Sequence, residues 1–308
     1  MTYLDYALAM ARPLRLERPG AVYHISTLGN AGQAVFRGPD DSQLFLDVLG
    51  EACRRFHWRC LAYCLLPDRY TLVVVTDAAT LSRGMRQING PYTQAFHRRH
   101  GSAGHLFQGR YRAVMVEQAG YLAFVCCDVL RQPVRRGVAP EAGAWRWSSY
   151  RATMGRLTHG QMAPDWLDSG PLLAAYGTDR QQARAQLAAA VAQEPSQSVW
   201  EHLRHQVFLG SEGFVEAMRE EARLAAAGRG DLREIPRAQW QPPPPALESF
   251  AQGAASRDEA MALAYLSGAY SQAAIASYFG VHYSSVSRAI RRYERRQPMA
   301  ATGANAGE

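Results

Sequence analysis

The sequence predicts an α+β fold, in which a ferredoxin-like antiparallel sheet is followed by an all-α region and a helix-turn-helix. Three observations predict it. Strand-like and helix-like patterns alternate up to about residue 156, a helical region rich in Ala and Gln follows, and a compact helical pattern comes after four consecutive prolines. The order βαββαβα in the first half favours an antiparallel sheet with helices packed on one face.

The N-terminal elements follow from residue type and periodicity. Residues 21–26 are typical of a strand, and apolar residues at helical spacing predict a helix from Asp40-Asp41 to Phe56. Two β-rich runs, 58–66 and 70–76, are joined at Pro67-Asp68 and predict a hairpin. The remaining elements are a helix at 81–100 that Gly90-Pro91 should kink, a strand at 114–116, and a helix at 121–131 that ends near Pro133.

The second half of the chain is predicted to be helical, with amphipathic stretches at 178–192 and 199–207. The prolines at 242–245 favour a stiff polyproline spacer. The predicted segments are a sheet domain (11–156), a helical extension (160–236), a proline-rich linker (237–255), a helix-turn-helix (256–297) and a disordered tail (298–308).

The C-terminal segment carries a helix-turn-helix pattern. Helices are predicted at 259–266, at 272–279 with Ser271 as its cap, and from 283 onward, with Gly280 in the tight turn. The last helix would expose short polar side chains that can reach base edges and arginines that can hold phosphates. These predicted DNA contacts are Tyr283, Ser284, Ser285, Arg288, Arg291 and Arg292.

Composition supports a nucleic-acid partner. The net charge is +7, and all 34 basic residues are arginine, whose planar guanidinium suits phosphates and bases. A GC-rich genome would also favour arginine codons. The five cysteines lack zinc spacing and are read as reduced thiols in a cytoplasmic protein. The longest stretch free of charge, 260–287, is broken by glycine and polar residues, so no membrane span is expected.

A series of motifs runs through the first 150 residues: RPLR (12–15), GAVYH (20–24), YCLLP (63–67), SRGMRQ (82–87), HLFQGRY (105–111), PVRRG (133–137) and WSSY (147–150). Together they closely resemble the REP-associated tyrosine transposases, which belong to the HUH single-strand transposases. The QVFLGS motif (206–211) and the helix-turn-helix resemble longer members of that group.

The resemblance implies a specific chemistry on single-stranded DNA near hairpins. In that family a tyrosine on a helix attacks a phosphodiester and becomes joined to the 5′ end. Two histidines separated by one residue hold a divalent Mg or Mn ion, which polarises the phosphate. An amide or acid one helical turn after the tyrosine completes the metal shell.

This sequence departs from the family at those positions. The two histidine positions are Arg69 and Thr71, and the tyrosine position, aligned on Pro133-Val134, is Asp128. The later amide is kept as Gln132. A guanidinium repels a divalent cation, so no cofactor is expected. Arg69 and Asp128 are candidates for an ion pair that replaces the metal.

The residues that would handle DNA are better preserved than the chemistry. Arginines alternate with Tyr92, Phe96, Phe107 and Tyr111, a pattern suited to stacked bases and phosphates. The predicted contacts are Arg83, Arg86, Arg98, Arg99, Arg110 and Arg112.

Three functions stay open. The favoured one is a catalytically inactive transposase relative that binds hairpin or single-stranded DNA and duplex DNA, with a monomer favoured and no membrane partner. The alternatives are an active transposase with a rearranged site, in which Tyr121 or Tyr70 replaces the nucleophile, and an RNA-binding regulator.

Overall fold

A computed structural model describes residues 16–158, 162–195, 198–227, 246–266, 270 and 272–296. The chain divides into two compact units, Met1–Leu232 and Arg233–Glu308. The RPLR motif at 12–15, Ser271, residues 237–245 of the predicted linker and the predicted tail lie outside the described residues.

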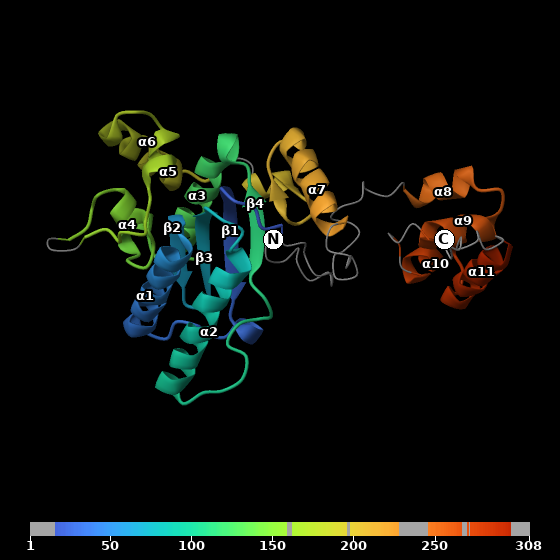
Figure 1. The fold of residues 1–308 in the computed structure, drawn as a ribbon, viewed down its shortest axis with the longest axis horizontal. Coiled ribbons are helices and arrows are strands. Elements are labelled where there is room, and N and C mark those ends of the chain that lie inside the picture. Colours follow the sequence, from blue (N-terminus) through green and yellow to red (C-terminus); the bar gives the residue numbers. More distant parts are fainter. Residues whose placement is uncertain are drawn as a thin grey trace, which may run out of the picture. The chain divides into compact units, whose positions relative to one another are not determined.

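The first unit is built on a mixed six-stranded sheet (Figure 1). Its strands are β1 (Ala21–Leu28), β2 (Trp58–Leu66), β3 (Arg69–Thr76), β4 (Arg112–Val116), β5 (Leu203–Arg204) and β6 (Phe208–Leu209), in the order β2-β3-β1-β4-β6-β5. The first four strands are all antiparallel to their neighbours. Strand β6 pairs parallel to β4 and antiparallel to β5. The expectation of a wholly antiparallel sheet is therefore wrong.

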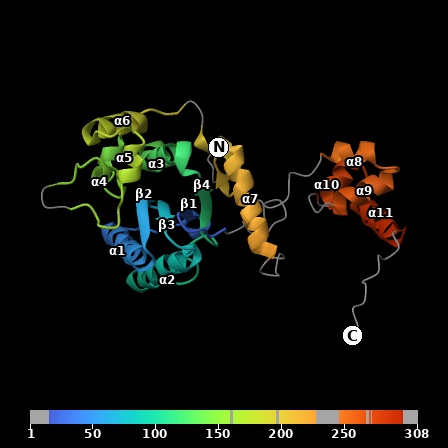
Figure 2. The same cartoon turned by 45° about the horizontal axis from the view of Figure 1, so that its top comes forward.

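Helices cover both faces of this sheet, and the expectation of helices on one face is wrong (Figure 2). One face packs against α1 (Pro39–Phe56) and α2 (Leu81–His100). The other packs against α3 (Gln118–Arg135), α5 (Gly170–Ala174) and α6 (Arg180–Ala192). The reason lies in β2 and β3, where almost every residue is buried, so each strand has two apolar faces to cover.

The other elements of this unit are short, apart from α7. They are the 3-10 helices η2 (Asn30–Gly32), η3 (Ala142–Ala144) and η4 (Val199–His202), and the helices α4 (Tyr150–Thr153) and α7 (Glu212–Ala227). Helix α2 continues through Pro91. The helix predicted at 199–207 is wrong. His205 and Gln206 have positive φ angles of 51° and 64°, so the chain turns there and returns as β6.

The regular elements among the described residues of the second unit are all helices: α8 (Leu247–Gly253), α9 (Arg257–Leu266), α10 (Gln272–Phe279) and α11 (Tyr283–Arg296). Helix α8 lies inside the stretch expected as linker, and its Leu247 and Phe250 pack on the unit's core. That core joins Met261, Ile275, Val286 and Ile290 from three helices. Among the described residues, no helix is long and apolar enough to cross a bilayer.

Candidate functional site

Four sequence-predicted positions meet at one small cavity between the sheet and α3. Arg69 and Thr71 come from β3, and Asp128 and Gln132 come from α3, one helical turn apart. The cavity has a volume of about 50 Å³. It is lined by His24, Ser26, Thr27, Leu28, Arg69, Thr71, Asp128, Gln132, Arg135, Arg136 and Trp200.

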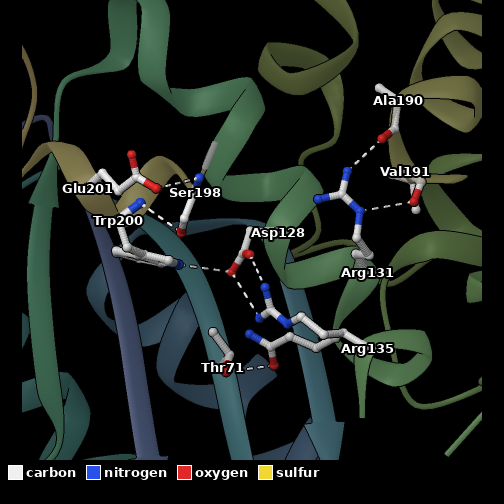
Figure 3. A network of polar contacts seen from close by, with 10 residues as sticks. Thr71, Asp128, Arg131, Arg135, Ala190, Val191, Ser198, Trp200 and Glu201 are labelled. Carbon is white, nitrogen blue, oxygen red and sulfur yellow. Dashed lines mark hydrogen bonds and ion pairs between the residues drawn. The ribbon is translucent and has the colours of Figure 1, made fainter. Parts of the chain in front are cut away.

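Thr71 and Gln132 contact each other at the floor of this cavity. Both are buried, and the Thr71 hydroxyl donates to Gln132 Oε1 over 3.0 Å (Figure 3). Ser26 of β1 is the register partner of Thr71 on β3 and of Arg112 on β4. Residues paired across strands share one face of the sheet, so these three side chains form a row beneath α3.

Asp128 is buried and held by two donors (Figure 3). Arg135 forms an ion pair with it, from Nη1 to Oδ1 over 2.5 Å. The indole Nε1–H of Trp200 donates to Oδ2 over 3.2 Å. Arg135 follows Asp128 by seven residues, two turns of α3, and this spacing is a signal that sequence analysis missed. Trp200 is far away in sequence and gives no such signal.

The expected ion pair between Arg69 and Asp128 is wrong. The Arg69 guanidinium instead forms two hydrogen bonds, of 3.0 and 2.6 Å, with its chain neighbour Asp68. Burial alone would raise the pKa of Asp68, but the bonds from Arg69 hold it below its ordinary value. Two of the arginines at this cavity therefore pair with an aspartate close in sequence: Arg69 with Asp68, and Arg135 with Asp128.

His24 is a further buried residue at this site that sequence analysis missed. It lies on β1, and its ring meets the Trp200 ring edge-on, with centroids 4.6 Å apart. Burial lowers its pKa to about 4; the nearby Asp128 opposes that shift and Arg112 adds to it. His24 is therefore neutral at pH 7.

The divalent metal that the resemblance implies does not fit this set of donors. Asp128 is the cavity's carboxylate, and Arg135 and Trp200 already occupy its oxygens. Three guanidinium groups line the same space and would repel a cation, and Thr71 and Gln132 offer only neutral oxygens. Across the described ranges, no three His, Cys, Asp or Glu side chains are placed to share an ion.

Neither substitute tyrosine lines the cavity. Tyr70 points to the opposite face of the sheet, where it is buried against Phe45 and donates to Asn89 Oδ1 over 2.6 Å. Burial raises its pKa, which disfavours the phenolate. Tyr121, at the other end of α3, packs edge-on against His202.

The predicted DNA surface along α2 is only partly available. Arg83, Arg86, Arg98 and Arg110 are exposed. Arg99 is committed to buried Asp41, which also accepts from His100, and Arg112 is half-buried on β4. The aromatic part of the interpretation is wrong for three of its four residues, whereas Tyr111 is half-buried. Tyr92, Phe96 and Phe107 are buried in the core beneath α2, where no base can stack on them.

The second unit places its predicted contacts at the start of α11. Tyr283 is 58% exposed, Ser284 and Ser285 are half-buried, and Arg288 is exposed. His282 Nδ1 lies 2.9 Å from Ser284 Oγ and caps this turn. Arg292 is exposed but forms an ion pair with Asp258 over 2.9 Å. The side chain of Arg291 lies outside the described set.

The turn before α11 depends on a glycine. Gly280 has a φ of +61°, its N–H donates to Ser277, and the next N–H, of Val281, donates to Ala276 over 2.9 Å. These two backbone hydrogen bonds form the Schellman motif, which ends a helix with a residue in the left-handed conformation. It directs the chain from α10 into α11.

Comparison with known proteins does not establish a family. No family profile matches the sequence, and no curated protein matches it significantly. Among solved structures, the chain is similar to a REP-associated tyrosine transposase bound to a REP hairpin, with 15% identity and a TM-score of 0.41. That match covers 52% of this chain and 93% of the other.

Proposed function

We propose that this chain is a DNA-binding protein with two separate DNA surfaces and no tyrosine strand-transfer activity. The first unit binds hairpin or single-stranded DNA without a divalent metal, and the second binds duplex DNA. We assign β1 to β4 to a ferredoxin-like sheet, supported by the antiparallel order β2-β3-β1-β4. We assign α10 and α11 to a helix-turn-helix, supported by the Gly280 turn and their shared core.

Exposed arginines on the first unit support the hairpin surface. Arg86 and Arg98 on α2 are both exposed, and neither forms an ion pair with any described residue. The surplus of positive charge over the whole chain, +7, favours a polyanion. Contacts of this kind bind the backbone of DNA and release counterions.

The observation that carries the loss of strand transfer is the state of Asp128. This residue occupies the position where the resembling family has its tyrosine, and it is buried in an ion pair with Arg135. A carboxylate neutralised in this way is a poor nucleophile, and the cavity beside it holds guanidinium groups in place of metal ligands.

The binding test uses fluorescence anisotropy on the full chain with a DNA hairpin, the same hairpin as RNA, and a DNA duplex. We expect DNA hairpin affinity to be unchanged by EDTA and to fall with salt. Arg86→Gln with Arg98→Gln should weaken hairpin binding and reduce the salt slope by about 2. The matched control is Arg180→Gln, an exposed arginine on α6, which should bind like the natural chain.

Loss of binding in EDTA would show that a metal is required and would contradict the proposal. A clear preference for the RNA hairpin would favour the RNA-binding alternative.

The activity test looks for a covalent protein–DNA adduct on denaturing gels after incubation with Mg²⁺ or Mn²⁺. We expect none, since each 1.36 kcal/mol of lost transition-state stabilisation costs about tenfold in rate and both metal ligands and nucleophile are replaced. An adduct mapped to Tyr121, Tyr70 or another tyrosine would establish the rearranged enzyme.

A further inference from the structure

The cavity beneath α3 has the wrong charge for a cation and the right charge for an anion. Arg69, Arg135 and Arg136 line it, against the single carboxylate of Asp128. Asp68 offsets part of the Arg69 charge, and Arg112, the register partner of Ser26, adds charge from the neighbouring strand β4. The balance around the cavity is positive.

Neutral hydrogen-bond donors also converge on this space. The Ser26 side chain is more than nine-tenths buried, lines the cavity, and its hydroxyl has no hydrogen-bond partner among the described residues. A buried hydroxyl without a partner costs free energy, so it points to a missing ligand. Because Gln132 accepts from Thr71 through Oε1, its amide nitrogen keeps two N–H donors.

The size of the cavity restricts the ligand. A buried water needs roughly 10–15 Å³, so about 50 Å³ holds a few waters or one small tetrahedral oxyanion. A phosphodiester offers fewer unsubstituted oxygens and less negative charge than a terminal phosphate, so fewer of these donors could act on it. A terminal phosphate has three unsubstituted oxygens and a charge near −2 at pH 7, which suits several donors at once.

We propose that this cavity binds a terminal phosphate oxyanion, in particular the 5′-phosphate of a DNA strand held by the first unit. That the phosphate belongs to a DNA strand rests on the proposed function. That the cavity binds a phosphate rests on the cavity alone. Arg69 and Arg136 supply charge, and Ser26 and Gln132 supply the neutral donors. The site then recognises a strand end and needs no metal.

The first test compares one DNA hairpin with a 5′-phosphate and with a 5′-hydroxyl, using anisotropy and the full chain. The natural protein should bind the phosphorylated hairpin about tenfold more tightly. Millimolar inorganic phosphate should abolish this preference and leave affinity for the 5′-hydroxyl hairpin unchanged. Equal affinity for the two hairpins would overturn the assignment of the 5′ end.

Two variants separate a specific site from general electrostatics. Ser26→Ala changes no charge, yet it should reduce the preference several-fold. Its melting temperature should stay the same or rise, because the lost hydroxyl had no partner. Arg136→Gln should also reduce the preference. The control Arg180→Gln removes one charge from α6 and should keep the preference for the 5′-phosphate. If this control loses the preference equally, the proposed site is wrong.

Direct calorimetry with inorganic phosphate distinguishes failure of the site from failure of DNA binding. If no DNA binds, a saturable heat of phosphate binding that disappears in Ser26→Ala still supports the phosphate site. In that case only the proposed DNA binding is wrong. If the hairpins bind but the natural chain shows neither phosphate heat nor a 5′-phosphate preference, the phosphate site fails alone.

Discussion

Asp128 shows how one residue depends on partners that its sequence neighbours do not reveal. Its carboxylate is buried, and the side chain of Arg135, whose guanidinium neutralises it, is 36% exposed. Such a pair adds little over an apolar pair, but breaking it leaves an uncompensated charge. The geometry therefore makes removal of Arg135 alone more costly than removal of the pair.

This gives a prediction for stability. Arg135→Gln should destabilise the first unit by about 2 kcal/mol, because Asp128 is left buried and charged. Asp128→Asn combined with Arg135→Gln should recover most of that loss. Urea unfolding of the two single variants and the double variant measures the coupling. Additive losses would show that the pair does not act as a unit.

The second prediction at the residue scale concerns pH and His24. Its pKa is about 4 in the folded protein and about 6.5 in an unfolded chain. The unfolded state therefore binds the proton first, so stability is present above pH 6.5 and is lost as pH falls toward 4. The expected loss by pH 5 is about 2 kcal/mol.

Urea unfolding at pH 7.5 and pH 5.0 measures this loss. His24→Gln should lose much less stability over the same interval, whatever its stability at pH 7.5. An equal loss in the variant would assign the pH dependence to other groups.

At the scale of elements, α2 sits close to β2 because Gly84 has no side chain. A Cβ at Gly84 would lie 2.1 Å from Trp58 Cζ2, and the Trp58 indole is fixed by its bond to Thr80 Oγ1 of 3.0 Å. Gly84→Ala should therefore push α2 outward and cost about 2 kcal/mol. Gly213→Ala on α7, where a Cβ meets nothing within 4 Å, should be neutral or slightly stabilising. Thermal unfolding of both variants makes the comparison.

The turn between α10 and α11 offers a second prediction at this scale. Gly280 has space for a Cβ but a positive φ, so the cost of Gly280→Ala is backbone strain of about 1 kcal/mol. If α10 and α11 form a helix-turn-helix, weaker duplex binding should accompany the loss of stability, and hairpin binding should stay unchanged. Circular dichroism melting and anisotropy measure the two effects.

At the scale of the whole molecule, the two units carry different predicted partners. Truncation after Gln241 removes α8 to α11 and leaves the sheet unit intact. We expect duplex affinity to fall at least tenfold and hairpin affinity to change less than twofold. Anisotropy at several salt concentrations tests both. Equal duplex affinity of the truncated and full chains would remove DNA binding from the second unit.

Local patterns determined many of the helices and strands of this protein, although not the segment 199–209. Strand β2 and helix α10 have the predicted bounds, and the glycine in the turn has the positive φ that its position implied. These features depend on side-chain periodicity and backbone preference, which act over a few residues. The four positions aligned with the resembling family, three altered and one kept, also met at one cavity, because two of them share a strand and two share a helix face.

Only the tertiary structure decided which charges pair and which faces are covered. Trp200 reaches Asp128 from a distant segment, His24 packs against Trp200, Arg69 turns to Asp68, and β6 joins the sheet as a parallel strand. The physical reason is that a buried charge or an apolar strand face must find a partner, but several partners satisfy it equally in the sequence. Packing across the sheet selects one of them, and that selection made the cavity positive.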